Sequence, residues 1–335
     1  MSQAEFEIIR RYFKESALNF SRQGIEKSIG DDGALIKIPP DHLLCMSMDA
    51  LVAGVHFPYS ADAAMIANRA LAVNLSDLAA MGAEPYCFTL ALVLPENNPA
   101  WLEKFSGGLL RLAQRFNCPL VGGDITEGPL SIVIQVHGLN QPDRVIRRDG
   151  AKPGDSVYVS GCLGDGAIAL ASIGIRSHLG EAVELIDETL PDACREYFRA
   201  AYYEPEPRIE LAGRCNALVS AGIDISDGLL GDLGHILNAS GVGAELNVHR
   251  LPYSESSTCC TSPENRLRAA LYGGDDYELC LTVSPQQISA LESVAEKLNT
   301  RISCIGEIVE GDGIVCLDEA GQVIELTDHP YEHFL

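Results

Sequence analysis

Hydrophobic positions follow helical and strand periods in turn along the whole chain. Phe6, Ile9 and Phe13 are spaced three and four apart, which predicts an opening helix. Further helices are expected over 61–81, 99–117, 164–174, 207–221, 229–240 and 285–299, and strands over 34–38, 43–51, 86–94, 131–139, 157–160, 223–226, 278–283, 301–308 and 314–317. Ser60 is the expected N-cap of the second helix. Both halves of the chain mix the two kinds of element, which predicts an α/β or α+β fold.

A short segment rich in proline, glycine and charge separates two groups of elements. Residues 140–155 read NQPDRVIRRDGAKPGD, a composition typical of a domain boundary. The length of 335 residues also suits two domains of roughly 100–200 residues each. We therefore expect an N-terminal domain over 1–140, a linker over 141–155 and a C-terminal domain over 156–335. A stretch rich in Ser, Thr and Cys at 252–263 is expected to be a loop.

One predicted strand carries polar residues at alternate positions. In the strand over 43–51, a period of two puts Ser47 and Asp49 on one face and Met46 and Met48 on the other. We expect the methionines to pack in the core, which would turn the serine and the aspartate toward a site.

The helix over 61–81 carries a polar pair on an otherwise apolar segment. Asn74 and Asp77 are three positions apart and therefore share a helix face. Burying an unpaired polar group costs free energy. The pair must therefore be exposed, hydrogen-bonded or functional.

The net charge of the chain argues against some classes of binding partner. The sequence has 47 acidic and 24 basic residues, a formal charge of −23. Such an acidic surface argues against nucleic acid and anionic membranes as partners. The first residues lack the order of a signal peptide, and no apolar stretch reaches the ~20 residues that span a bilayer. The 11 cysteines form no CxxC pair, which favours structural thiols in a reducing, cytoplasmic compartment.

Acidic residues recur in six short segments, most of them beside glycine. These are GDDG at 30–33, SMD at 47–49, NLSD at 74–77, GGD at 122–124, DISDG at 224–228 and GGDD at 273–276. Carboxylates beside glycines that permit close backbone approach suit a hard divalent cation such as Mg²⁺, which commonly bridges carboxylates to phosphates. Any one of these segments is equally well explained by a capping or turn aspartate. Spacing alone leaves the two explanations open.

Several familiar catalytic motifs are absent from the sequence. It has no GxxxxGK[ST] phosphate loop, no GxGxxG after a strand, and no HRD or DFG pair of a protein kinase. GxSxG and HExxH are also missing. A nucleotide site in this chain would therefore have to be built differently from the common ones.

Seven ordered motifs resemble one enzyme family. They are GDDGALI at 30–36, SMDALVAGVHF at 47–57, ALAVNLSDLAAMGAEP at 70–85, GGDITEGPLSI at 122–132, RRDGAKPGD at 147–155, DISDGLLGDLGHI at 224–236 and GGDDYELC at 273–280. Together they resemble the bacterial thiamine-monophosphate kinase family, of the aminoimidazole ribonucleotide synthetase-like superfamily. The resemblance implies an N-terminal mixed-sheet domain that forms a homodimer, a C-terminal α+β domain, and ATP bound in the cleft between domains.

The resemblance also implies a reaction. ATP would phosphorylate thiamine monophosphate to thiamine diphosphate, in thiamine diphosphate biosynthesis, by direct in-line transfer with several Mg²⁺ ions. The acceptor phosphate is already largely deprotonated near pH 7, because its second pKa is about 6. No residue is therefore assigned as a general base. Whether K⁺ contributes is left open.

The resemblance assigns roles to particular residues. The residues that would bind magnesium offer oxygen ligands; they are Asp32, Ser47, Asp49, Asp77, Asp124, Asp224 and, for a further ion, Asp227. Those that would contact ATP are Gly123, Asp124, Arg148 and Ser226, and those that would contact the thiamine phosphate are His56, Asp275 and Tyr331. Arg148 suits a phosphate clamp because guanidinium grips phosphate oxygens in pairs; the alternative is a solvated linker charge. Met48 stands where a small hydroxyl residue is expected and is left off the ligand set.

Two alternatives to this function stay open. The first is another ATP-using enzyme of the superfamily, such as a selenophosphate synthetase, an aminoimidazole ribonucleotide synthetase or a hydrogenase maturation protein. A selenophosphate synthetase would need a reactive residue in a mobile N-terminal segment, whereas the first cysteine here, Cys45, lies in a predicted strand. The second alternative is a non-catalytic nucleotide-binding protein.

Overall fold

The computed structural model describes residues 3–173 and 190–324, and it divides into two compact units. The first unit contains Met1–Leu78 and Ala83–Asp143, and the second contains Ala79–Gly82 and Arg144–Leu335. The functional division into domains over 1–140 and 156–335 with a linker stays a prediction. Among the described residues, no helix has the length and apolar character needed to cross a bilayer.

The first unit is built on a four-stranded sheet. Its elements are α1 (Gln3–Ile8), the π-helix η1 (Ile9–Lys14), β1 (Ile25–Lys27), β2 (Leu35–Ile36), β3 (Leu43–Val52), α2 (Ala63–Ala80), β4 (Glu84–Leu94), α3 (Pro99–Arg115), β5 (Leu120–Glu127), β6 (Ser131–Asn140) and the 3-10 turn η2 (Pro142–Arg144). The sheet order is β3-β6-β4-β5, while β1 and β2 form a separate pair. Strands β4 and β5 run parallel, and the other neighbours in the large sheet run antiparallel.

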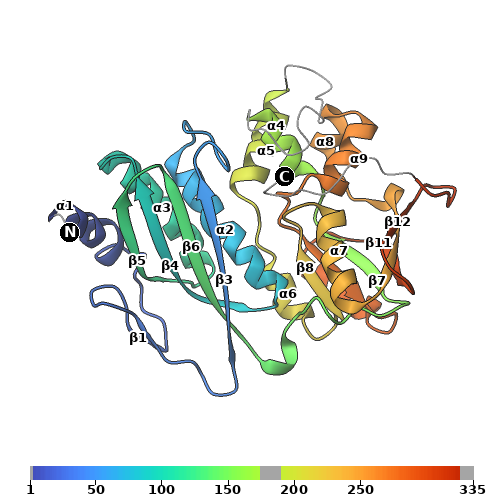
Figure 1. The fold of residues 1–335 in the computed structure, drawn as a ribbon, viewed down its shortest axis with the longest axis horizontal. Helices are drawn as coiled ribbons and strands as arrows, with labels where there is room; N and C mark the ends of the chain where they lie inside the picture. Colours follow the sequence, from blue (N-terminus) through green and yellow to red (C-terminus); the bar gives the residue numbers. More distant parts are fainter. Residues whose placement is uncertain (1–2, 174–189, 325–335) are drawn as a thin grey trace. The chain divides into compact units, whose positions relative to one another are not determined.

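Helices α2 and α3 cover one face of this sheet (Figure 1). Every second residue of β6, Ile132, Ile134 and Val136, is fully buried on that face. Gly108 of α3 lets the two helices approach closely, because a Cβ there would lie 2.4 Å from the carbonyl oxygen of Ala64 in α2. The first unit thus has a helix-covered face and a second face that its helices leave uncovered.

Two details of the first unit differ from the expectations. The segment GGDITE forms most of strand β5 rather than a turn, and it pairs with β4 over Phe88–Leu94. Its apolar alternation is weak because it is an edge strand, with few positions facing a core. Helix α2 begins at Ala63. The carboxylate of Asp62, rather than Ser60, accepts a first-turn N–H, from Ala64 at 2.9 Å.

The second unit is built on a six-stranded sheet in the order β12-β9-β11-β7-β10-β8. Its strands are β7 (Ser156–Ser160), β8 (Ala221–Asp224), β9 (Gly243–Asn247), β10 (Leu279–Val283), β11 (Ile302–Val309) and β12 (Ile314–Leu317). Its helices are α4 (Asp165–Ser172), α5 (Asp192–Tyr203), α6 (Ile209–Cys215), α7 (Leu229–Ser240), the 3-10 turn η4 (Val248–Arg250), α8 (Glu255–Cys260), α9 (Pro263–Tyr272) and α10 (Ile288–Lys297). Only the β12–β9 pair is parallel among these neighbours.

One face of the second sheet packs against α6 and α10. Leu211 of α6, Leu291 of α10 and Leu281 of β10 share one buried cluster with Tyr158 of β7. Helix α7 lies against β8 and β10, and its first turn follows β8 after a short loop. This arrangement fixes the ends of β8 and β10, where several of the predicted site residues stand.

Two expectations for the second unit are wrong. The single helix over 207–221 is instead a shorter helix, Ile209–Cys215, followed by strand β8. The segment 252–263 contains helix α8, which begins where Ser254 Oγ accepts the N–H of Ser257 at 3.0 Å. A side-chain cap of this kind starts a helix even where residue composition favours a loop. The role of a possible insert over 176–188 is left open by the sequence, and these residues lie outside the part of the chain that the structure describes.

Candidate active site

Strand β3 and helix α2 bring four polar residues of the first unit together. Ser47 Oγ donates a hydrogen bond to Asp77 Oδ2 at 2.5 Å, and the backbone N–H of Asp49 donates to Asn74 Oδ1 at 3.1 Å. Asn74 is fully buried, and its amide nitrogen also donates to the carbonyl of Ala70 at 2.9 Å. The predictions that Ser47 and Asp49 share a strand face, and that Asn74 and Asp77 share a helix face, are confirmed.

The opposite face of β3 is exposed in the first unit. Met46 is 57% exposed and Met48 is 61% exposed, so the expectation that they pack in the core is wrong. The reason is that α2 packs against the face that carries Ser47, which places the serine and not the methionines beneath the helix. An alternating pattern separates the two faces of a strand but does not say which of them is covered.

Asp124 lies at the far edge of the same sheet. Strands β6 and β4 run between β3 and β5, so three strand spacings, roughly 14 Å, separate the two edges. The ladder also aligns Asp124 with Ala50, the neighbour of Asp49, and neighbouring positions point to opposite faces. Within this unit, Asp124 is therefore kept apart from the Ser47–Asp77 pair.

Asp32 and Gly123 also stand at the surface of the first unit. Asp32 lies in the exposed segment between β1 and β2, where its N–H donates to Asp31 Oδ1 at 3.2 Å. Gly123 has φ +156, and a Cβ there would lie 1.9 Å from the carbonyl oxygen of Leu90. Over residues 3–173 and 190–324, no three His, Cys, Asp or Glu side chains are grouped as a metal site. The full ligand set thus stays a prediction.

His56 is oriented by the end of strand β3. The backbone N–H of Val52 donates to His56 Nδ1 at 3.0 Å. Because Nδ1 accepts this bond, the proton of the neutral ring sits on Nε2. The imidazole is half-buried. One ring nitrogen is thus used to fix the orientation of a residue predicted to contact the substrate.

The predicted residues of the second unit gather at one end of its sheet. Strands β7 and β8 end there, at Ser160 and Asp224, and β10 begins there with Leu279, which pairs with Asp224. Helices α4 and α7 begin shortly after these two strands. The N–H groups at helix N-termini favour anions. This end of the sheet therefore suits a phosphate-bearing ligand, and Asp224, only 6% exposed, stands directly on it.

A buried carboxylate holds the loop after β8. Asp232 Oδ2 accepts the N–H groups of Ser226 and Asp227, both at 3.0 Å, and Asp232 is only 2% exposed. Burial raises the pKa of Asp232 to about 7; the Asp227 carboxylate adds to the rise, while the two backbone bonds and Arg148 oppose it. The sequence analysis missed this residue, although it lies inside the DISDGLLGDLGHI motif.

The loop before β10 binds the loop after β8. The N–H of Asp275 donates to the carbonyl of Ser226 and that of Tyr277 to the carbonyl of Ile225, both at 2.8 Å. Gly274 permits this approach, because its φ is +65 and a Cβ would lie 2.3 Å from the Ser226 carbonyl oxygen. The structure therefore brings Asp275 next to Ser226.

Arg148 and Tyr331 complete the predicted set. Arg148 is exposed, its carbonyl accepts a bond from Ser240 Oγ at 2.8 Å, and its charge acts on Asp232. A guanidinium near the loop after β8 agrees with a phosphate contact but is also compatible with a solvated charge. Tyr331 lies outside the described residues.

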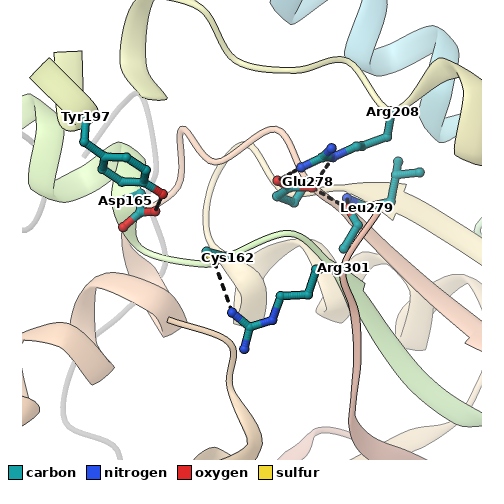
Figure 2. Close-up of polar contacts among 8 residues, drawn as sticks. Cys162, Asp165, Tyr197, Arg208, Glu278, Leu279 and Arg301 are labelled. Carbon is teal, nitrogen blue, oxygen red and sulfur yellow. Dashed lines mark hydrogen bonds and ion pairs between the residues drawn. The ribbon is translucent and has the colours of Figure 1, made fainter. Parts of the chain in front are cut away.

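A pocket of about 320 Å³ adjoins these loops. On its wall, Arg208 Nε and Nη2 donate to Glu278 Oε2 and Oε1 at 2.6 and 2.5 Å, and Ser160 Oγ also donates to Glu278. Tyr197 Oη donates to Asp165 Oδ2 at 2.6 Å, and burial raises the pKa of Asp165. All four residues line the pocket, and Figure 2 shows the Tyr197–Asp165 pair on one side of the segment that carries Cys162 and the Arg208–Glu278 pair on the other.

The sequence analysis did not select these pocket residues. Glu278 directly follows the GGDDY segment, so its place beside a site motif was a usable signal. Arg208 and Tyr197 stand in segments without a comparable motif. Their place at the pocket depends on the fold, which brings α5 and the segment before α6 to the beginning of β10, next to Glu278.

The side chains in both units suit a hard cation and an anionic ligand. The pair Ser47–Asp77 and the residues Asp49, Asp224 and Asp227 offer hydroxyl and carboxylate oxygens, which Mg²⁺ prefers. The donor chemistry therefore fits magnesium.

Two family models match most of the chain. The description "AIR synthase related protein, N-terminal domain" matches residues 30–140, and "AIR synthase related protein, C-terminal domain" matches residues 152–318. Together these matches cover more than half of the chain. They show the two-domain fold expected from the motifs, with mixed sheets and helices in both halves.

Similar proteins with known names agree over the full length. Thiamine-monophosphate kinase of Escherichia coli (strain K12) is 42% identical over 334 residues, covering 100% of this chain and 99% of that protein. The crystal structure of thiamine-monophosphate kinase from Stenotrophomonas maltophilia K279a is 41% identical, with a TM-score of 0.82 over 94% of this chain and 97% of that one. A structure described as AaThiL complexed with AMPPCP and TMP is 28% identical, with a TM-score of 0.73 over 98% and 96%. The chain therefore belongs to the thiamine-monophosphate kinase family, a family of enzymes.

Proposed function

We propose that this enzyme transfers the γ-phosphoryl group of ATP directly to the phosphate of thiamine monophosphate, giving ADP and thiamine diphosphate. The observation that carries the proposal is the full-length 42% identity to a thiamine-monophosphate kinase. The similar AaThiL structure, complexed with AMPPCP and TMP, supports the two substrates. A non-catalytic nucleotide-binding protein would not be expected to keep this identity together with both polar clusters.

Magnesium is the proposed metal. Asp32, Ser47, Asp49, Asp77, Asp124, Asp224 and Asp227 are the proposed ligands, because all offer the oxygen atoms that Mg²⁺ takes. When bound, the ions would neutralise the charge of the triphosphate, which explains how an acidic chain accepts an anionic substrate. A requirement for K⁺ is left to experiment.

The remaining proposed contacts fall into two groups. Gly123, Asp124, Arg148 and Ser226 would bind ATP, with Arg148 holding phosphate oxygens in pairs. His56, Asp275 and Tyr331 would bind thiamine monophosphate. His56 Nδ1 is already occupied by the Val52 N–H, so the proton on Nε2 would be the donor toward the phosphate. Asp275 lies beside Ser226, which would put a contact to each substrate on adjoining loops.

No general base is proposed. The acceptor oxygen belongs to a phosphate that is largely ionised near neutral pH. Positioning and charge neutralisation then account for the rate, and Arg148 supplies positive charge from the chain itself. A direct transfer forms no phosphorylated residue, and trapping one with labelled ATP would contradict this part of the proposal.

A homodimer is also proposed, with strand β3 in the interface. Leu44, Met46 and Met48 are 42%, 57% and 61% exposed and follow one another at alternate positions on the uncovered face of an edge strand. A row of large apolar side chains is a common mark of a protein interface. A partner seated there would shield this row from water.

A cytoplasmic location is proposed as well. None of the 11 cysteines, all of which lie within the described residues, forms a disulfide, and Cys87, Cys118 and Cys280 are buried. Disulfides persist in oxidising compartments, and a chain with this many thiols and no disulfide suits a reducing one.

The decisive experiment measures ADP release from Mg·ATP with and without thiamine monophosphate, and again with a metal chelator. Release that requires both the metal and thiamine monophosphate, with thiamine diphosphate as product, would support the proposed function. Binding of ATP without any reaction or binding of thiamine monophosphate would overturn the substrate assignment. In that outcome another ATP-using activity of the superfamily becomes the leading candidate.

A further inference from the structure

Three residues proposed to bind magnesium or ATP stand at the end of strand β8 and on the short loop after it. Asp224 is the last residue of β8, and Ser226 and Asp227 lie between β8 and helix α7. The loop ends at Gly228, with φ +110, where a Cβ would lie 2.6 Å from the carbonyl carbon of Tyr272. Because this backbone is neither helix nor strand, its polar groups need partners from elsewhere in the fold.

The carbonyl side of the loop is held by the segment before β10. The N–H groups of Asp275 and Tyr277 donate to the carbonyls of Ser226 and Ile225, both at 2.8 Å. The N–H of Ile225 also donates to the carbonyl of Glu278 at 2.8 Å. These bonds fix two carbonyls and the first N–H of the loop, and they leave the N–H groups of Ser226 and Asp227 to be bound by another group.

The N–H side of the loop is held by Asp232. This residue lies in the first turn of α7, where its own N–H donates to the carbonyl of Gly228 at 3.0 Å. Its Oδ2 accepts the N–H groups of both Ser226 and Asp227 at 3.0 Å, and it is 2% exposed. Hydrogen bonds to a carboxylate are about twice as strong as those between neutral groups.

We infer that Asp232 is a positioning residue, which sets the orientation of Ser226 and Asp227 by binding their two backbone N–H groups. It acts through the loop, and it is not itself one of the proposed ligands. The inference rests on the proposed function, since it concerns the loop assigned to ATP and magnesium. The loop is thus held from both sides: the segment before β10 binds its carbonyls and the N–H of Ile225, and α7 binds the N–H groups of Ser226 and Asp227.

Two substitutions separate positioning from bulk stability. Asp232→Leu keeps a side chain of similar size but removes the acceptor, whereas Asp232→Asn keeps an acceptor oxygen and removes the charge. A displacement of about 1 Å in a positioning group can cost on the order of 10²-fold in rate. We expect Asp232→Leu to lower kcat/KM for ATP by about that factor, and Asp232→Asn to recover at least a tenth of the wild-type value.

Asp155 provides a matched control. It is also buried in the second unit, at 4% exposure, and its Oδ2 accepts the N–H of Lys152 at 3.0 Å and a bond from Ser220 Oγ at 2.5 Å. Asp155→Leu should therefore remove a comparable pair of bonds at the start of strand β8, where Ser220 lies, and not at its end, where the loop begins. We expect it to lower the melting temperature without weakening the binding of AMPPCP.

The main measurement is calorimetric binding of AMPPCP with Mg²⁺ to the full chain, together with hydrogen exchange at the amides of Ser226 and Asp227. The inference predicts weaker binding and faster exchange at those two amides in Asp232→Leu. Binding within twofold of the wild type would overturn it, as would an equal loss in Asp155→Leu. If Asp232→Leu does not fold, Asp232→Ala, which also removes the acceptor, takes its place: unchanged exchange at both amides would overturn the inference.

The two measurements also distinguish a failure of this inference from a failure of the proposed function. AMPPCP binding and amide exchange need no reaction, so both remain measurable if thiamine monophosphate proves not to be the substrate. A wild-type chain that binds AMPPCP but makes no thiamine diphosphate would count against the function alone. A fully active wild type whose Asp232→Leu variant is equally active would count against the positioning role alone.

Discussion

Ser47 and Asp77 lie 30 positions apart in the sequence and share a hydrogen bond of 2.5 Å that joins strand β3 to helix α2. A second bond, from the N–H of Asp49 to Asn74 Oδ1, joins the same two elements nearby. Two bonds fix the strand relative to the helix in both position and register. Burial raises the pKa of Cys45, and the charge of Asp77 adds to this rise.

Asp77→Ala tests whether this carboxylate serves the reaction. We expect at least ~10²-fold loss of thiamine monophosphate-dependent ADP release, the scale of removing one electrostatic stabiliser. The loss should be partly overcome by raising the Mg²⁺ concentration if Asp77 binds metal. Initial rates over a Mg²⁺ titration check both points.

Ser106→Ala, which removes a bond from Ser106 Oγ to the Glu103 carbonyl in helix α3, is the control and should leave the titration unchanged. Near-wild-type turnover of Asp77→Ala would remove it from the ligand set.

Gly123→Ala should disturb strand β5 through backbone geometry alone. Its φ of +156 is unfavourable for alanine, and the new Cβ would lie 1.9 Å from the Leu90 carbonyl oxygen in the neighbouring strand. We expect a loss of about 2 kcal/mol or more in unfolding free energy, measured by urea denaturation. Gly107→Ala is the matched control. It adds a Cβ inside helix α3 with no other atom within 4 Å and should stabilise the chain by up to about 1 kcal/mol. Equal effects of the two changes would contradict the argument.

Helices and strands were predicted best where a single hydrophobic period runs through the segment. Helix α7 at Leu229–Ser240 and strand β12 at Ile314–Leu317 have the expected bounds, because both carry strong apolar patterns and end beside glycine or charge. Strand β5 was missed because its glycines and acidic residues suggested a turn. Helix α8 was missed because its six residues are mostly small and polar, and its stability comes from the Ser254 cap and the burial of Ser257 and Cys260.

Residues of the candidate site were predictable only where their partners follow from a local period. The shared faces of Ser47 with Asp49 and of Asn74 with Asp77 follow from two such periods, one in a strand and one in a helix. The bond between Ser47 and Asp77 depends in addition on how α2 packs on the sheet. Asp232 could not be found this way, because its partners depend on how the chain turns back from α7 onto the preceding loop. The alternation of polar and apolar residues could not predict the exposure of Met48 either, since this depends on which face of the sheet α2 covers.

Met48→Glu tests the proposed dimer. Met48 is 61% exposed on edge strand β3, so the change should leave the fold of one chain intact while it places two like charges near each other across a symmetric interface. We expect a dimeric wild type to become mostly monomeric, as measured by analytical ultracentrifugation. Val323→Glu changes a residue that is 68% exposed in the second unit and should leave the mass unchanged. A wild type that is monomeric at all concentrations would rule out the dimer.

The raised pKa of the Asp165 carboxyl predicts that the stability of the fold depends on pH. It is 5% exposed and accepts bonds from Tyr197 Oη at 2.6 Å and Ser254 Oγ at 2.7 Å. Burial raises its pKa above the usual 3.8, although both bonds oppose the rise. A carboxyl whose pKa is higher in the folded chain favours folding below its unfolded pKa. That contribution is lost as the pH rises through the folded value, because the unfolded chain ionises first.

Asp165→Asn should therefore weaken the dependence of the melting temperature on pH. Asparagine does not ionise, so the variant should lose less melting temperature than the wild type between pH 4 and pH 8, measured by thermal unfolding at each pH. The buried Asp232, whose pKa is also raised by burial, titrates in both proteins and cancels in the difference. The charge of Asp165 adds to the raised pKa of the buried Asp276, so the substitution lowers that pKa and changes the pH dependence in the same direction. Asp143→Asn, a change at an exposed aspartate, should follow the wild-type curve. If Asp165→Asn runs parallel to the wild type over this range, then the Asp165 carboxyl is not protonated preferentially in the folded chain.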